Sequence, residues 1–176
     1  MINSKLRQYV INRRKQLIKS GEINSFSKKI VDKIINSKEF DSAKNVALYY
    51  PLDGEINLLD LLKIKNKSYF FPRCKGDNLE FVKFVSQDAM YVDKYSIKVP
   101  KGESVIPEIF DVIYVPCLLA NKDCYRLGWG KGYYDRFFSS NTLKCKKCIV
   151  VLSEFISDEF EIQEYDFQLD MLISED

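Results

Sequence analysis

One glycine-rich segment holds the residues whose types and spacing are best suited to chemistry. It runs from Arg126 to Phe137, with the sequence RLGWGKGYYDRF, and contains three alternating glycines, a lysine and an aspartate. Glycines spaced in this way let backbone N–H groups approach an anion closely and adopt positive φ angles. The residues after the last glycine are typical of a first helical turn, which also favours anions. The segment therefore predicts a phosphate or nucleotide site to which Arg126 and Lys131 add positive charge; the alternative is a tight, solvated connection.

This segment and four others together resemble the signature of a known enzyme family. The chain is similar to the 5-formyltetrahydrofolate cyclo-ligase family, whose members are also called methenyltetrahydrofolate synthetases. The matches keep their order and spacing over nearly the whole chain, so together they are more specific than any one alone. They lie at Tyr49–Ile56 (YYPLDGEI), Phe71–Arg73 (FPR), Asp111–Pro116 (DVIYVP), Arg126–Phe137 and Asp166–Asp170 (DFQLD).

The resemblance implies a reaction. It would cyclise 5-formyltetrahydrofolate to 5,10-methenyltetrahydrofolate and convert ATP to ADP and phosphate. In the mechanism that the family implies, the formyl oxygen attacks the γ-phosphate, and N10 of the same folate then displaces the phosphorylated oxygen. This route needs no protein nucleophile, so the protein would act by positioning and charge compensation.

The resemblance also implies which residues bind ATP. The glycine-rich segment would hold the phosphates, and Arg126 and Lys131 would be the catalytic residues that stabilise the transferred charge. Arg7 matches the arginine of an N-terminal element that contacts ATP, but Asn3 replaces the lysine of that element, and Lys5 could compensate. The predicted set is Arg7, Arg73, Arg126, Leu127, Gly128, Trp129, Gly130, Lys131, Gly132, Tyr133 and Tyr134.

A second predicted set binds the folate. Glu55 follows a strand and a tight turn and resembles the folate-contacting glutamate of the family, and a carboxylate accepts hydrogen bonds from pterin N–H groups. Aromatic side chains such as Tyr50 could stack on the rings of the ligand. From the residues alone, Glu55 could instead flank a helix and the tyrosines could belong to the core. The predicted set is Tyr50, Glu55, Trp129, Gly130, Lys131, Gly132 and Tyr133.

Two aspartates are the predicted metal ligands. The resemblance implies that Asp135 and Asp170 bind Mg²⁺, which usually takes one or two protein carboxylates together with phosphate oxygens and water. Asp135 would also be favoured at a helix N-terminus without any ligand. The chain has no histidine, so carboxylates would carry any metal or acid–base role. Cys145 and Cys148 have zinc or redox spacing, but we expect them to be core or loop thiols.

Composition indicates the class of protein and its partners. A chain of 176 residues with 46% hydrophobic content supports one domain, 1–176, around a single core. A net charge of only +2 gives no overall field of the kind that drives nucleic-acid or membrane association. Five cysteines, an odd number, and the lack of a secretory or transmembrane pattern predict a cytoplasmic protein without disulfides. We expect a monomer whose partners are small molecules.

The order of predicted elements favours an α/β fold. Apolar spacing predicts a helix over residues 5–19, in which Arg7 and Arg14 share one stripe, and a second helix capped by Ser25 or Ser27. A short helix is expected at 58–65 and irregular surface loops at 88–107. Strands are expected at 46–50, 68–71, 79–85, 111–115 and 148–152.

This alternation predicts a single three-layer α/β/α domain with a mostly parallel central sheet. Ligands then bind beyond the carboxyl ends of the strands, where the loops after Tyr50, Phe71 and Pro116 would meet. A non-catalytic nucleotide or sugar-phosphate binding module is an alternative function, and it predicts binding without turnover. A sugar-phosphate isomerase on a similar scaffold would need no ATP. An RNA-binding protein would need a recognised module, which the chain lacks.

Overall fold

A mixed seven-stranded sheet forms the centre of the computed structural model, which describes residues 2–176. The strand order is β11-β10-β7-β1-β2-β3-β6, and neighbours from β11 to β2 run parallel. The last two strands, β3 and β6, run antiparallel to their neighbours. The strands are β1 Asn45–Ala47, β2 Ser68–Lys75, β3 Asn78–Lys83, β6 Ser104–Val105, β7 Val112–Pro116, β10 Lys146–Val150 and β11 Met171–Ile173.

The central strands are buried on both faces. Val46 of β1 pairs with Tyr69 of β2 on one side and with Val112 of β7 on the other. All three side chains are buried, as are the three residues that follow Val112 along β7. A continuous apolar run of this kind is typical of a parallel strand that is covered by helices.

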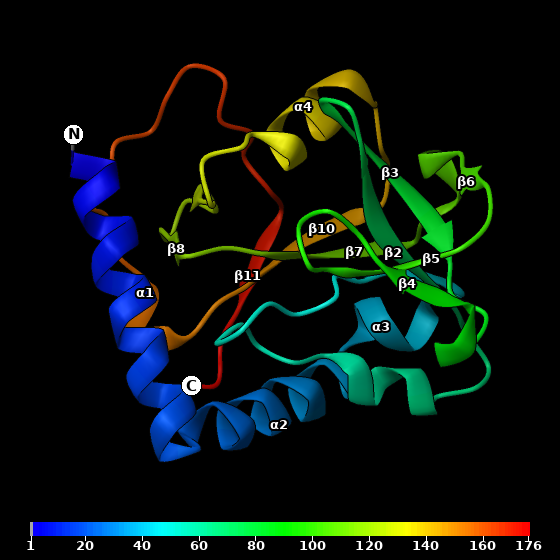
Figure 1. Cartoon of the computed structure of the whole chain (residues 1–176), viewed down its shortest axis with the longest axis horizontal. Coiled ribbons are helices and arrows are strands. Elements are labelled where there is room, and N and C mark those ends of the chain that lie inside the picture. The colour runs from blue at the N-terminus through cyan, green and yellow to red at the C-terminus, as the bar shows by residue number, and fades with distance from the viewer. Residues whose placement is uncertain (1) are drawn as a thin grey trace.

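Helices lie on both sides of this sheet. They are α1 Ile2–Ser20, α2 Glu22–Ile35, α3 Lys38–Ser42 and α4 Tyr133–Ser140. In Figure 1, α2 runs along the bottom of the molecule and α4 along the top, with the strands between them, and α1 stands at one side. This arrangement confirms the predicted α/β class with a mostly parallel central sheet. Of the helices in residues 2–176, none is long and apolar enough to cross a membrane.

The first two helices are longer than predicted, and a single glycine separates them. Gly21 has a φ angle of 79°, a left-handed conformation that ends α1 and turns the chain directly into α2. The predicted cap at Ser25 or Ser27 is therefore wrong, because α2 begins at Glu22 with no side-chain cap. Ser27 lies inside the helix, and its hydroxyl accepts a hydrogen bond from the backbone N–H of Asn57 at 3.0 Å.

The predicted strands that belong to the sheet are confirmed within a few residues at each end. The predicted helix at 58–65 is a 3-10 helix, Leu59–Lys63. The 88–107 region, predicted as irregular loops, contains a hairpin of β4 (Met90–Val92) and β5 (Lys98–Pro100) as well as β6. A second small hairpin joins β8 (Leu119–Ala120) and β9 (Arg126–Leu127). Strands of two or three residues are too short to show periodicity in the sequence, so only their pairing with neighbouring strands defines them.

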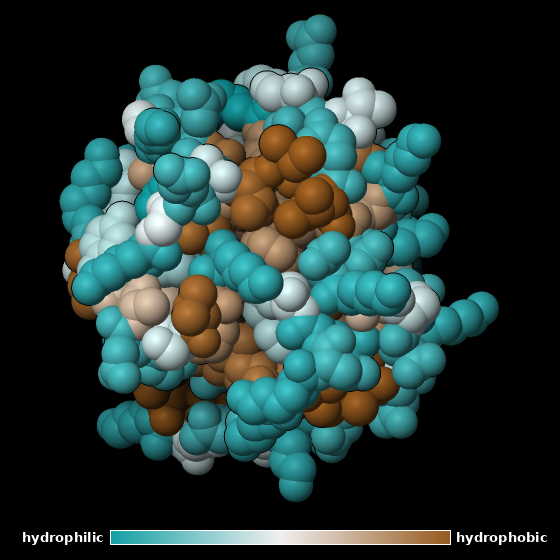
Figure 2. Space-filling view, turned by 90° about the vertical axis from the view of Figure 1, so that its right-hand side faces the viewer, coloured by the Kyte–Doolittle hydropathy of each residue, from teal (hydrophilic) through white to brown (hydrophobic). Residues whose placement is uncertain are grey.

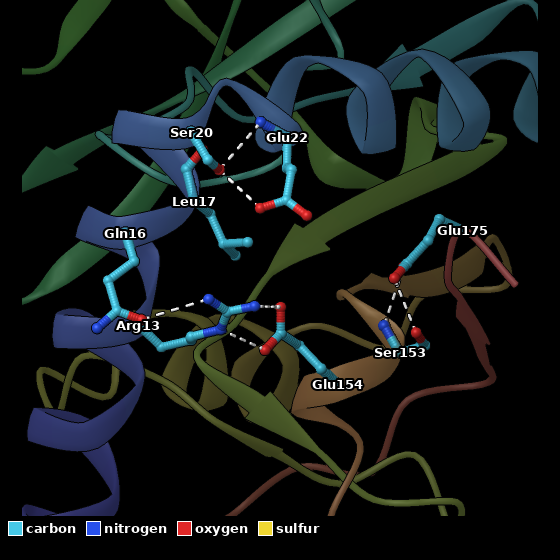
Figure 3. A network of polar contacts seen from close by, with 8 residues as sticks. All are labelled: Arg13, Gln16, Leu17, Ser20, Glu22, Ser153, Glu154 and Glu175. Atoms are coloured by element: carbon cyan, nitrogen blue, oxygen red, sulfur yellow. Dashed lines mark hydrogen bonds and ion pairs between the residues drawn. The ribbon is translucent and has the colours of Figure 1, made fainter.

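Polar contacts and apolar packing hold α1 in place. Figure 3 shows Arg13 of α1 paired with Glu154, which lies after β10; Nε and Oε2 are 2.8 Å apart. Each of these side chains is about one third exposed, so the pair contributes little to stability. Val10 and Leu17 are fully buried on the same helix and supply the larger contribution. The face of α1 that carries Arg14 is thereby held against the core.

The face that carries β4, β5 and β6 is more apolar than its surroundings. Figure 2 looks onto the right-hand side of the molecule, where hydrophobic groups break a mostly hydrophilic surface. The exposed hydrophobic side chains on or next to these strands include Tyr91, Val92 and Ile106. Scattered apolar side chains of this kind are usual on protein surfaces.

Gly54 offers a test of how closely the turn before Glu55 packs on α1. Its φ angle is +77°, and a Cβ atom there would lie 2.7 Å from Cβ of Arg14. Gly21 has a nearly equal φ of +79° but open space around it. We expect Gly21→Ala to lower the free energy of unfolding by about 1–2 kcal/mol, the cost of the left-handed conformation. Gly54→Ala should cost roughly 1–3 kcal/mol more because of the clash. Urea denaturation measures both, and equal losses would contradict this packing.

Candidate functional site

A cavity of about 1060 Å³ lies where the loops that follow several strands meet. Tyr49 and Tyr50 line it just after β1, and Pro116 lines it at the end of β7. The position agrees with the expectation that ligands bind beyond the carboxyl ends of parallel strands. Most of the predicted site residues line this cavity: Arg7, Tyr50, Glu55, Arg126, Leu127, Gly128, Trp129, Gly130, Lys131, Gly132, Tyr133, Tyr134 and Asp135.

The glycine-rich loop between β9 and α4 forms one wall of the cavity. Gly130 and Gly132 have φ angles of 92° and 66°, which glycine adopts without steric cost. A Cβ atom on Gly130 would also lie 3.5 Å from Cζ of Arg7, so the loop approaches α1 closely. Residues 132–135, at the N-terminus of α4, line the cavity next to the exposed Lys131. The positive end of a helix and a free cation therefore lie together, an arrangement suited to phosphate.

Packing and backbone contacts hold this loop in place. The Phe137 ring of α4 lies 5.2 Å from the Phe81 ring of β3, and both side chains are buried. Arg136 donates hydrogen bonds to the backbone carbonyls of Lys131 and Asp77, each at 2.9 Å. The loop is thus anchored from both α4 and the turn between β2 and β3.

A buried ion pair joins the two ends of the loop. Nη2 of Arg126 lies 3.1 Å from Oδ1 of Asp135, and the two side chains are only 4% and 14% exposed. Oδ1 of Asp135 also accepts a hydrogen bond from the backbone N–H of Phe167. The Arg126 guanidinium lies 5.4 Å from the centre of the Tyr134 ring. Nε of Arg126 has no hydrogen-bond partner in residues 2–176, so it is an unsatisfied buried donor on a side chain that lines the cavity.

The N-terminal helix brings a second arginine to the loop. Nε of Arg7 donates a hydrogen bond to the carbonyl of Gly128 at 2.9 Å. Asn3, which replaces the lysine of the family, also lines the cavity, and its side chain exchanges two hydrogen bonds with the backbone of Glu161. Lys5 is not among the lining residues. Asn3 therefore makes a neutral contact at the position where the resemblance implies a lysine.

Glu55 lies buried at the junction of the two predicted subsites. Its Oε2 accepts a hydrogen bond from the backbone N–H of Leu52 at 2.9 Å, which closes the turn that precedes it. Its Oε1 accepts one from the indole Nε1 of Trp129 at 3.1 Å. The glutamate predicted to bind folate is thus bonded directly to the glycine-rich loop. Tyr50 packs nearby against Phe71, with ring centres 6.0 Å apart.

A segment that the sequence predicted as a surface loop supplies another wall. Tyr95, Ile97 and Val99, on or just before β5, all line the cavity. The hydroxyls of Tyr95 and Tyr133 are 2.9 Å apart, so this segment contacts the N-terminus of α4. β5 has only three residues, so the sequence carries no periodic signal that could have revealed this wall of the cavity.

Tyr133 and Tyr134, which line the cavity, have raised pKa values. Burial raises the pKa of Tyr134, and the nearby Glu55 carboxylate raises it further. The hydrogen bond between the Tyr133 and Tyr95 hydroxyls is the first cause that raises the pKa of Tyr133. The Tyr134 hydroxyl has no hydrogen-bond partner in the described residues. Both phenols therefore stay protonated at neutral pH, and they are poorly suited to act as bases.

The structure does not bring Arg73 to the cavity. Side chains alternate along β2, so Pro72 and Cys74 line the cavity and Arg73 points to the opposite face. There its Nε donates to Oε1 of Glu80 at 2.8 Å, and Nη1 donates to the carbonyl of Gly102. The prediction that Arg73 contacts ATP rested on its place in a motif, whereas the pleat of the strand turns its side chain away.

The two predicted metal ligands are in different surroundings. Asp135 lines the cavity, and its Oδ2 accepts no hydrogen bond in residues 2–176. Asp170 does not line the cavity; it lies at the amino end of β11 and pairs with Lys147 at 2.9 Å. Within the described residues there is no cluster of three or more histidine, cysteine or acidic side chains that could hold a metal ion. Asp135 fits a single carboxylate ligand that works with phosphate oxygens and water.

Comparison with known proteins places this fold and site in one class. The NMR structure of a 5,10-methenyltetrahydrofolate synthetase from Aquifex aeolicus matches with a TM-score of 0.87 and 32% identity, over 99% of this chain and 90% of that one. A 5,10-methenyltetrahydrofolate synthetase from Mycoplasma pneumoniae matches with a TM-score of 0.78 and 27% identity over both complete chains. The present chain has the same fold as these structures.

Sequence comparison gives the family. A 5-formyltetrahydrofolate cyclo-ligase of Mycoplasma genitalium is 31% identical over 173 residues, which are 92% of this chain and 94% of the relative. The model of the 5-formyltetrahydrofolate cyclo-ligase family matches residues 2–175. The chain belongs to this family, and the resemblance inferred from its motifs is confirmed.

Two cysteines test the position of the cavity. Cys74 lines the cavity and Cys124 does not, and both are partly exposed with pKa values raised by burial. Their alkylation by iodoacetamide should be slow at pH 7 and should accelerate as the pH rises past the usual thiol pKa, because only the thiolate reacts. Saturating ATP with 5-formyltetrahydrofolate should protect Cys74, as measured by peptide mass spectrometry. Cys124 is the internal control, and equal protection of both thiols would contradict this placement.

Proposed function

We propose that the chain is an ATP-dependent enzyme that cyclises 5-formyltetrahydrofolate to 5,10-methenyltetrahydrofolate with release of ADP and phosphate. Membership of the cyclo-ligase family supports this reaction. The observation that carries it is the hydrogen bond between Trp129 and Glu55. It joins a glycine-rich anion loop to a buried carboxylate inside one cavity, which suits a reaction between a phosphate donor and a folate.

The glycine-rich side of the cavity would bind ATP. The backbone N–H groups of residues 128–132 and the N-terminus of α4 would hold the phosphates. Lys131 and the free Nε of Arg126 would stabilise the charge that spreads over the transferred phosphoryl oxygens. Arg7 would position the loop through its hydrogen bond to Gly128. Mg²⁺, when bound, would neutralise phosphate charge, and Asp135 is the residue placed to hold it.

The opposite side would bind the folate. Glu55 would accept hydrogen bonds from the pterin N–H groups, for which a carboxylate has the right acceptors. Tyr50, Trp129 and Tyr133 offer ring faces and edges, and the apolar Ile97 and Val99 complete this wall. A monomer would suffice for the reaction, because these groups and the anion loop line the same cavity of one chain.

The chemistry would proceed between the two substrates. The formyl oxygen attacks the γ-phosphorus, an O–P bond forms, and the bond from that phosphorus to the ADP oxygen breaks. N10 then attacks the phosphorylated imidate carbon, the C–O bond breaks, phosphate leaves and N10 loses its proton. Buried guanidinium and backbone donors that are already in place would stabilise both charge-shifting steps. The protonated tyrosines are consistent with a protein that contributes donors and no nucleophile.

A single assay tests the proposal. Purified protein, 5-formyltetrahydrofolate, ATP and Mg²⁺ are mixed, and the near-ultraviolet absorbance of a methenyl product is followed. We expect a rise that requires ATP. Binding of ATP without any turnover would favour a non-catalytic nucleotide-binding module and contradict the proposed enzyme.

Two substitutions test the role of the loop. Lys131→Ala and Asp135→Ala should each lower kcat/KM roughly 100- to 1000-fold. The first removes a cation from the phosphate site, and the second removes the partner of Arg126 and the carboxylate proposed to hold Mg²⁺. Lys122→Ala, which alters an exposed lysine that does not line the cavity, is the matched control and should be nearly silent. Circular dichroism checks folding. Near-normal rates for both loop variants would remove the loop from the mechanism.

A further inference from the structure

A buried arginine on α1 lies behind Glu55 without lining the cavity. Arg14 is 6% exposed and lies between the buried residues Val10 and Leu17 on the inner face of α1. Its Nη2 donates a hydrogen bond to the carbonyl of Cys117. Its Nε and Nη1 have no hydrogen-bond partner in the described residues. A permanently charged group with two free donors in a core needs an electrostatic partner.

Glu55 supplies that partner. Nη1 of Arg14 lies 3.9 Å from Oε1 of Glu55, which is within ion-pair range but too long for a hydrogen bond. The two side chains are 7% and 3% exposed, so water screens their attraction little. Gly54 makes the approach possible, because any Cβ there would lie 2.7 Å from Cβ of Arg14. The turn that carries Glu55 is therefore packed directly on Arg14.

Oε1 of Glu55, the oxygen nearest to Arg14, also contacts a residue that lines the cavity. Oε1 of Glu55 accepts the hydrogen bond from the Trp129 indole, which lines the cavity. An N–H group of a folate that bonded to this oxygen would share it with the indole or replace it there. Arg14 faces the same oxygen from the protein side and would stay in place during that exchange.

We infer that Arg14 is a positioning residue that holds the Glu55 carboxylate in place for folate. This inference rests on the proposed function. Arg14 would not touch either substrate; it would raise folate affinity through Glu55 and leave the ATP side unaffected. Arg14 is thus distinct in role from Arg7 and Arg126, which lie on the phosphate side of the cavity.

A double-mutant cycle on ligand binding tests this role. The dissociation constant for 5-formyltetrahydrofolate is measured by calorimetry without ATP for the wild type, Arg14→Met, Glu55→Gln and the double variant. Arg14→Met should weaken folate binding roughly 10- to 100-fold in the wild-type background. In the Glu55→Gln background the same change should shift affinity by less than about threefold. The Kd for ATP should stay constant, and KM for folate should change more than kcat.

Two further variants separate positioning from general packing. Arg14→Lys keeps the positive charge and should recover most of the lost folate affinity. Arg13→Met removes the neighbouring exposed arginine, which pairs with Glu154, and should leave folate binding unchanged. If Arg14→Met is too unstable to measure, as urea denaturation would reveal, the cycle is run with Arg14→Gln, which removes the charge and keeps a polar side chain.

The outcomes distinguish this inference from the proposed function. Equal losses of folate affinity from Arg14→Met in both backgrounds would overturn the role of Arg14, and so would a parallel loss of ATP affinity. No recovery in Arg14→Lys would also overturn it, because packing alone would then explain the effect. A wild-type protein that does not bind 5-formyltetrahydrofolate would instead overturn the proposed function, and the role of Arg14 with it.

Discussion

The need to compensate two buried guanidinium groups shapes the walls of the cavity. Arg126 is paired with Asp135 across the glycine-rich loop, and Arg14 faces Glu55 from α1. A charge taken out of water is costly unless an opposite charge or hydrogen bonds replace the solvent, so each arginine restricts where its carboxylate can lie. Asp135 lies in the first turn of α4, and Glu55 lies at the end of the turn after β1. The two ion pairs therefore connect α1, the sheet and the loop into one frame.

Within this frame, the cavity combines fixed groups with free ones. The loop is held by Arg136 and by the packing of Phe137 against Phe81. Nε of Arg126 and the hydroxyl of Tyr134 remain unpaired in the described residues. Donors that are positioned in advance need little reorganisation when charge develops on a substrate. Phosphoryl transfer depends mainly on electrostatic stabilisation of this kind. The hydrogen bond between Trp129 and Glu55 places the two halves of the cavity in direct contact.

The sequence predicted the class of fold and most of the cavity because both depend on local signals. Apolar runs such as the one in β7 identify buried strands, and alternating glycines identify a loop that needs positive φ angles. Short strands escaped prediction, since pairing with neighbours defines them; β4 and β5 are the clearest case. The start of α2 was also missed, because the left-handed Gly21 turns the chain without a separate cap.

The sequence by itself determined which residues carry charge, where glycine permits a tight turn and which family the motifs resemble. Only the tertiary structure decided which of those residues meet. Arg73 belongs to a motif, yet the pleat of β2 turns it toward Glu80 and away from the cavity. Asp170 also belongs to a motif of the family, yet it lies beside Lys147 at the amino end of β11. Arg14 looked like an ordinary residue of a basic helix, and the packing of α1 on the turn at Gly54 brings it to Glu55. The reason is physical: composition and spacing specify chemistry along the chain, whereas the facing of a side chain depends on strand pleat and helix packing in three dimensions.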